Sequence, residues 1–177
     1  MKIGIIVGST RVGNVGHLIG KWVVDQGKGR KMTYELVNLA DFGLPLFGEK
    51  EAKEQVQKWN DKINSLDGYI FIAAEYNHSI TGSLKNALDT AGIPTWIHKP
   101  AGIVSYGYAG GARAAEHLRT ILGALGVADV QQHVLINLNT EMSQTEGFKP
   151  ANYQVGLLTK LFDQVESWAT ALKSTRG

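Results

Sequence analysis

The sequence contains no cysteine. Disulfide bonds, cysteine-ligated zinc, iron–sulfur clusters and thiol chemistry are therefore excluded. Long hydrophobic runs are also missing, because no stretch of the 177 residues approaches the length that spans a bilayer. Met1 and Lys2 lead directly into a short apolar segment, without the pattern of a signal peptide. We therefore expect a cytoplasmic protein with no membrane partner.

The sequence also lacks a large excess of positive or negative charge. Lys and Arg together number 18 and Asp and Glu 16, which leaves a net charge of +2. No basic block occurs, so we expect no nucleic-acid partner. The histidines, at positions 17, 78, 98, 117 and 133, lack the spacing of a metal site, and we expect no metal. With 44% hydrophobic residues, the chain is expected to fold as a single domain over residues 1–177.

The clearest local signal lies in residues 1–16, MKIGIIVGSTRVGNVG. An apolar run ends at Gly8, and a polar, glycine-rich segment continues to Gly16, where a helical pattern begins. Such a strand–loop–helix unit presents backbone N–H groups at the positive end of a helix, and Ser9 and Arg11 add donors that suit a phosphate. One interpretation is a loop that binds a mononucleotide phosphate. The other is an ordinary strand-to-helix turn with a Ser/Thr N-cap.

Two well-known nucleotide motifs are absent from this segment. GxxxxGK[ST] requires a lysine that the sequence lacks here, and the glycines do not have the spacing of GxGxxG. Neither a P-loop nucleotidase nor a Rossmann dinucleotide site is therefore indicated.

The rest of the chain alternates between short apolar runs and amphipathic segments. We expect strands at 3–7, 34–37, 69–74, 101–105 and within 127–136, and helices at 15–26, 50–66, 82–91, 112–125 and 153–172. Residues 40–48, 92–100 and 137–150 are expected to be loops or irregular segments. The alternation predicts an α/β fold with a five-stranded parallel sheet and helices on both faces.

Three polar loops follow strands in this arrangement. They are residues 9–16 (the first loop), 75–81 (the middle loop) and 106–111 (the third loop). Ligands of open parallel sheets bind outside the carboxyl ends of the strands. We therefore expect the three loops to converge on one crevice.

Three segments of the sequence resemble a known family. GSTRVGNVG, EYNHSITGSLKNALD, and KPAGIVSYG followed by GGARAAEHLR are similar, in this order, to the NADPH-dependent FMN reductases. That family has a flavodoxin-like fold and includes quinone, azo and chromate reductases. The resemblance extends from residue 1 to about residue 136. One position departs from the pattern, because the family usually has proline before Glu-Tyr-Asn and this chain has Ala74.

The resemblance implies a binding site for FMN. The phosphate would be held by the first loop, through Ser9, Arg11, Asn14, Val15 and Gly16. The isoalloxazine ring would be bordered by the other two loops, through Glu75, Tyr76, Asn77, Ser105, Tyr106 and Gly107. We expect Gly107, Gly110 and Gly111 to let the backbone approach the flavin closely. We expect no catalytic side chain, because a flavin carries the chemistry itself.

The function implied by the resemblance is an FMN-dependent oxidoreductase. NADPH or NADH would donate a hydride through FMN to a small-molecule acceptor such as a flavin, a quinone or an azo compound. An alternative is a flavodoxin-like electron carrier without NAD(P)H oxidase activity, although such carriers are usually strongly acidic and the pI here is about 8.8. A third interpretation is a binding module without flavin.

The resemblance also implies a homodimer or homotetramer. We expect Leu84, Leu88, Ile93 and Trp96 to supply apolar surface for the contact between subunits.

Overall fold

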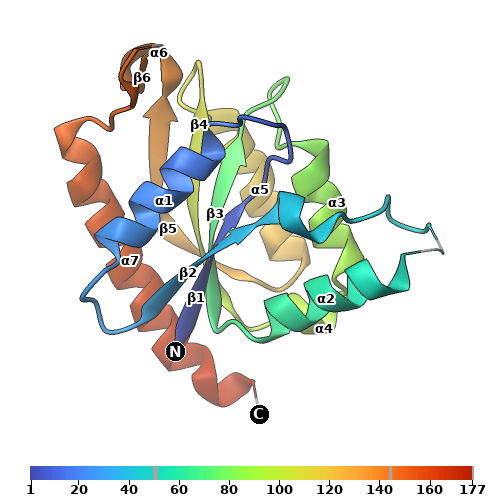
Figure 1. Ribbon diagram of the computed structural model, residues 1–177. Helices are drawn as coiled ribbons and strands as arrows, with labels where there is room; N and C mark the ends of the chain where they lie inside the picture. Colours follow the sequence, from blue (N-terminus) through green and yellow to red (C-terminus); the bar gives the residue numbers. More distant parts are fainter. Residues whose placement is uncertain (50–51, 144, 177) are drawn as a thin grey trace.

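The computed structural model describes residues 1–49, 52–143 and 145–176, and its centre is a five-stranded parallel sheet (Figure 1). The strands are β1 (Lys2–Val7), β2 (Thr33–Asn38), β3 (Gly68–Ala74), β4 (Pro100–Gly107) and β5 (Ala128–Asn137). Their order in the sheet is β2-β1-β3-β4-β5. This is the flavodoxin-like order, so the predicted fold class is confirmed.

Helices cover both faces of the sheet, and this is why the inner strands are apolar throughout. Every residue of β3 and β4 is buried, as expected for parallel strands covered on both sides. One face packs against α1 (Gly16–Gln26) and α7 (Asn152–Ala171). The other packs against α2 (Lys53–Asn64), α3 (Gly82–Thr90) and α5 (Ala112–Ala124). The expected start of α2 at residues 50–51 lies outside the described residues.

Three segments are more ordered than the sequence predicts. The expected loops contain the short helices η1 (Leu39–Phe42) and α4 (Ile93–Trp96). After β5, the expected irregular segment contains α6 (Leu138–Glu141) and a hairpin of β6 (Met142–Ser143) and β7 (Gly147–Phe148); the chain ends in η2 (Leu172–Thr175).

The buried carboxylate of Glu141 organises the segment after β5. It accepts the backbone N–H of Asn137 at 3.1 Å, the backbone N–H of Ala151 at 3.0 Å and the side-chain amide of Gln154 at 3.0 Å. One side chain therefore joins the end of β5, α6 and the start of α7.

The predicted apolar surface for subunit contact is wrong for three of its four residues. Leu84, Leu88 and Trp96 are at most 1% exposed and belong to the core. The Trp96 indole also donates to the Ala91 carbonyl at 2.6 Å, so its polar atom is satisfied inside the protein. Only Ile93, with 53% of its surface exposed, faces outward.

Among the residues described, none of the helices combines the length and the apolar character that crossing a membrane requires.

Candidate functional site

The first loop is folded by Asn14. The side-chain oxygen of Asn14 accepts the His17 backbone N–H at 3.0 Å, and its amide nitrogen donates to the Arg11 carbonyl at 2.9 Å. Asn14 thus caps the start of α1, a role for which the sequence suggested Ser or Thr. Asn is an equally good capping residue, so the signal was present in the sequence and was missed.

The capped loop leaves a row of donors unused. Within the described part of the chain, no hydrogen bond takes the backbone N–H of Thr10, Arg11, Val12 or Gly13. The Arg11 side chain is exposed and forms no ion pair with any described residue. Free amides at the amino end of a helix, beside a guanidinium, form an anion-binding arrangement.

Tyr106 supports the first loop from beneath. Its ring is buried, with 5% exposed, and its hydroxyl lies against Gly16 and close to the Ser9 side chain. A Cβ on Gly16 would lie 2.7 Å from this hydroxyl, so a side chain at this position would have to displace it. Burial raises the pKa of Tyr106 to about 12, against the opposing effects of its polar neighbours Gly16 and Ser9. The phenol is therefore protonated at neutral pH.

The start of α3 is hydrogen-bonded to the residue that precedes the first loop. Thr81 donates its hydroxyl to the Gly8 carbonyl at 2.6 Å and accepts the Leu84 backbone N–H at 3.1 Å as the cap of α3. Ser83 donates to the same Gly8 carbonyl at 2.9 Å. Sequence reasoning did not assign these two hydroxyls to the site, although Thr81 stands where an N-cap belongs.

The middle loop contains a tight two-residue turn. The backbone of Tyr76 donates to the Ser79 carbonyl at 2.9 Å, and Ser79 donates back at 3.0 Å. The two residues between them have positive φ, 48° at Asn77 and 69° at His78, which is the pattern of a type I′ turn. Asn tolerates this conformation, but His at the second position is strained. The turn holds Tyr76, Asn77 and His78 exposed beside the first loop.

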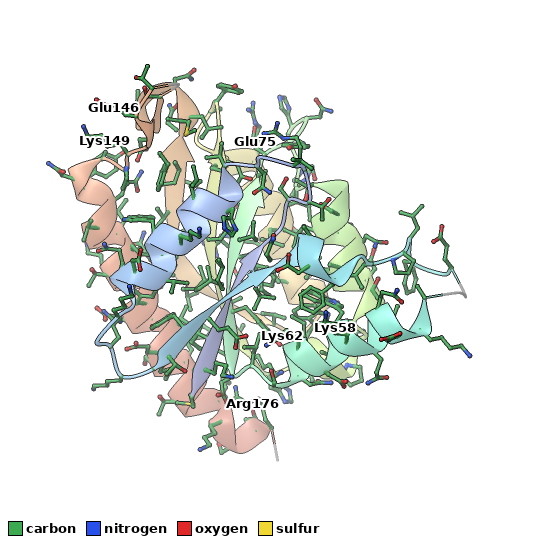
Figure 2. The ribbon with its side chains drawn as sticks, viewed as in Figure 1. Lys58, Lys62, Glu75, Glu146, Lys149 and Arg176 are labelled. Carbon is green, nitrogen blue, oxygen red and sulfur yellow. The ribbon has the colours of Figure 1, made fainter. Side chains whose placement is uncertain are left out.

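Glu75 joins the middle loop to α5. Its backbone N–H donates to the Tyr106 carbonyl at 2.8 Å. Its carboxylate, with 6% exposed, forms an ion pair with the Arg113 guanidinium and accepts the Arg113 backbone N–H at 3.2 Å. Figure 2 shows Glu75 at the end of the sheet opposite Arg176. Both polar groups of Glu75 therefore bind protein, whereas we expected them to face a ligand.

The third loop is tightly packed against its neighbours. A Cβ on Gly107 would lie 3.0 Å from the Glu75 Cβ, and one on Gly111 would lie 2.5 Å from the Tyr106 nitrogen. These glycines are required by contacts within the protein, whereas we expected them to make room for a ligand. Ser105 is fully buried in β4, and its hydroxyl has no hydrogen-bond partner among the described residues.

The structure thus brings the three loops together at the carboxyl edge of the sheet and sorts the predicted residues into two groups. Open to the site are Arg11, Asn14, Val15, Tyr76 and Asn77, whereas Ser9, with 1% exposed, and Gly16 are buried under the first loop. Turned into the protein are Glu75, Ser105, Gly107 and the side chain of Tyr106.

Comparison with known proteins gives this arrangement a context. A model of the NADPH-dependent FMN reductases matches residues 1–141. The chain belongs to this family. It is 31% identical over 162 residues to an NADPH azoreductase of Bacillus sp. (strain OY1-2), with 88% of each chain covered. It is also 38% identical over 131 residues to an NAD(P)H-dependent FMN reductase of Nectria sp., with 66% of this chain covered.

A solved structure also resembles this chain, and one relative is longer than the part that matches. FerB, a flavoenzyme NAD(P)H:(acceptor) oxidoreductase from Paracoccus denitrificans, is similar with a TM-score of 0.78 and 26% identity over 94% of this chain and 97% of that one. The match spans 65% of the length of the Nectria relative, just under two thirds. Membership of this FMN reductase family confirms the resemblance seen in the sequence.

The residues of the first loop fit the phosphate of FMN. A dianionic phosphate needs several donors and no nearby carboxylate. The loop offers unused amides from Thr10 to Gly13 and the Arg11 guanidinium, whereas the predicted donor Ser9 is buried. No adenine site beside the loop is required, because FMN is a mononucleotide.

Proposed function

We propose that this FMN reductase family member is an FMN-dependent oxidoreductase. It oxidises NADPH or NADH and reduces a small-molecule acceptor, such as a flavin, a quinone or an azo compound. The observation that carries the proposal is the joining of the three loops at the carboxyl edge of the sheet. Tyr106 contributes to all three, because its hydroxyl supports the first loop, its carbonyl accepts from Glu75 in the middle loop, and it begins the third.

Each part of the chain has a distinct task in this proposal. When bound, FMN supplies the redox chemistry, which is hydride acceptance from a nicotinamide and electron transfer to a second substrate. The amides of the first loop and Arg11 hold the phosphate. Tyr76 and Asn77, on their strained turn, border the ring and set its electrostatic surroundings. The ion pair of Glu75 with Arg113 keeps that turn in place against α5. No side chain acts as an acid, base or nucleophile.

The names of the relatives support the same chemistry. The Bacillus relative is an NADPH azoreductase, and FerB is named an NAD(P)H:(acceptor) oxidoreductase. The acceptor of this chain is therefore proposed as a class, because the relatives differ in theirs. A cytoplasmic location stays an expectation from the sequence.

Two measurements on the purified protein test the proposal. The absorption spectrum reports bound flavin, and steady-state oxidation of NADPH or NADH with a benzoquinone acceptor reports the enzyme. We expect a yellow protein that oxidises at least one of the two donors. A yellow protein that oxidises neither would favour the electron carrier, and a colourless protein that does not take up added FMN would contradict both.

We also propose that the subunits associate as a homodimer or homotetramer, through a surface other than the one expected from the sequence. Leu46 and Phe47 are 68% and 69% exposed. Asn86 holds them in this position, because it accepts the Phe47 backbone N–H at 2.8 Å and donates to the Pro45 carbonyl at 2.7 Å. Sedimentation should give a mass of at least two chains, and Phe47→Ser should lower it. A single-chain mass for the unaltered protein would contradict the proposal.

A further inference from the structure

The turn of the middle loop depends on supports outside itself. Its two central residues, Asn77 and His78, have positive φ values of 48° and 69°. In the described part of the chain neither of them forms a hydrogen bond. A strained residue persists only where the surrounding contacts over-determine its conformation. The shape of this turn is therefore set by the residues at its two ends.

Both ends of the turn are hydrogen-bonded to α5. Before the turn, the Glu75 carboxylate accepts the side-chain Nε–H of Arg113 at 2.6 Å and the backbone N–H of the same residue at 3.2 Å. After the turn, the Ser79 hydroxyl oxygen lies 3.0 Å from Nδ1 of His117. Either group can donate in this hydrogen bond. α5 thus contacts the loop on each side of the two central residues.

The spacing of these contacts makes α5 a rigid support for the turn. Arg113 and His117 are one helical turn apart and therefore project from the same face of α5. The opposite face of α5 is buried in the core, through Ala114, Ala115, Leu118 and Leu122. A helix that is fixed on one face can hold a loop in place with the other.

The two ends of the turn are not held equally. Glu75 is bound to Arg113 through its side chain and to the Tyr106 carbonyl through its backbone N–H. Ser79 exchanges two backbone hydrogen bonds with Tyr76, and these lie within the turn itself. The bond to His117 is therefore the contact that joins the Ser79 end to α5.

We propose that His117 is a positioning residue of the redox site, and that it acts through Ser79 on the turn of the middle loop. Its hydrogen bond holds the end of the turn against α5, and this fixes where Tyr76 and Asn77 lie beside the flavin ring. Neither His117 nor Ser79 contacts the flavin in this proposal. The inference rests on the proposed function, because the turn affects catalysis only when it borders a flavin.

The first experiment compares His117→Ala with His117→Asn in the FMN-loaded protein. Alanine removes the hydrogen bond, whereas the amide of asparagine keeps a polar atom close to the position of Nδ1. The rate of flavin reduction by NADPH or NADH should fall about twofold to tenfold in His117→Ala, the range for one neutral hydrogen bond, and recover in His117→Asn. The flavin spectrum should shift in His117→Ala, and FMN affinity should stay nearly unchanged because the first loop is intact.

A double-variant cycle tests whether His117 acts through Ser79. Ser79→Ala removes the same hydrogen bond from the other side, so it should slow flavin reduction as much as His117→Ala, and the double variant should be no slower than either. Glu116→Ala is the matched control, because Glu116 is the adjacent exposed residue of α5 and pairs with Arg119.

Three results of these kinetic measurements would overturn the proposal. The first is an unchanged reduction rate in His117→Ala, which would show that the chain after Ser79 holds the turn through Ile80, which is 7% exposed. The second is additive slowing in the double variant. The third is slowing of the same size in Glu116→Ala.

Amide hydrogen exchange of the FMN-loaded protein tests the support without any turnover. The backbone N–H groups of Tyr76 and Ser79 close the turn, and both should exchange about twofold to tenfold faster in His117→Ala. Faster exchange with an unchanged flavin spectrum and reduction rate would make the bond purely structural and overturn the proposal. Faster exchange with a shifted spectrum, in a protein that neither nucleotide reduces, would support the positioning role and refute the proposed function. Oxidation of NAD(P)H with unchanged exchange would do the reverse.

Discussion

The hydroxyl of Tyr106 offers a sharp test of how the first loop is held. Tyr106→Phe removes the hydroxyl that lies against Gly16 and near Ser9 but keeps the buried ring that packs beneath the loop. We expect FMN to bind more weakly, because the amino end of α1 and the Ser9 hydroxyl lose the group that fixes their positions. Riboflavin lacks the phosphate, so its affinity should change little.

The size of the effect follows from the contacts that are lost. Loss of the hydroxyl should cost no more than one neutral hydrogen bond, about 1 kcal/mol net, which corresponds to roughly a fivefold change in a dissociation constant. The phenol is protonated at neutral pH, since burial raises the pKa of Tyr106 to about 12. The predicted loss should therefore be the same at pH 6 and pH 8.

The assay is fluorescence titration of apoprotein with FMN and with riboflavin. Tyr108→Phe is the matched control, because Tyr108 lies in the same loop but is 76% exposed. A loss of about fivefold for FMN alone supports the reasoning. Equal losses for both flavins, or an FMN loss of the same size in Tyr108→Phe, would refute it.

Three other variants test separate parts of the account. Arg11→Ala should weaken FMN by about 1.5–3 kcal/mol and riboflavin far less, with near-normal turnover once FMN saturates; equal losses in flavin titrations would show that Arg11 does not hold the phosphate. Asn77→Ala should shift the flavin spectrum or reduction potential and slow reduction by NADPH, and an unchanged spectrum, potential and rate would make the middle loop purely structural. His78→Gly should raise the free energy of unfolding by about 1 kcal/mol in urea titrations, because glycine relieves a φ of 69°; a loss of stability would refute the strain.

The parallel sheet followed from the alternation of apolar runs and amphipathic helices in the sequence, and its flavodoxin-like arrangement followed from the family resemblance. The convergence of the three loops followed as well, because the carboxyl ends of parallel strands share one edge. The segment after β5 was not predicted, since its order depends on one carboxylate. Glu141 accepts hydrogen bonds from residues up to 13 positions away. Local sequence patterns do not reveal contacts over this separation.

The candidate site was predictable as a set of loops but not as a set of side chains. Glu75 carries the charge and the position of a ligand-facing residue, yet it pairs with Arg113, 38 residues further along the chain. The apolar pattern of Leu84, Leu88 and Trp96 is likewise ambiguous, because a core and a subunit interface use the same residues. Only the packing of α3 and α4 against α2 shows that these side chains are in the core.

Anaerobic titration of the purified, FMN-loaded protein with NADPH and, separately, with NADH tests the central claim most directly. The visible flavin absorption should bleach with at least one donor, at one donor molecule per bound flavin, and return when benzoquinone is added. A flavin that dithionite bleaches but neither nucleotide reduces would contradict the account, because the crevice would then bind FMN without accepting a hydride from a nicotinamide.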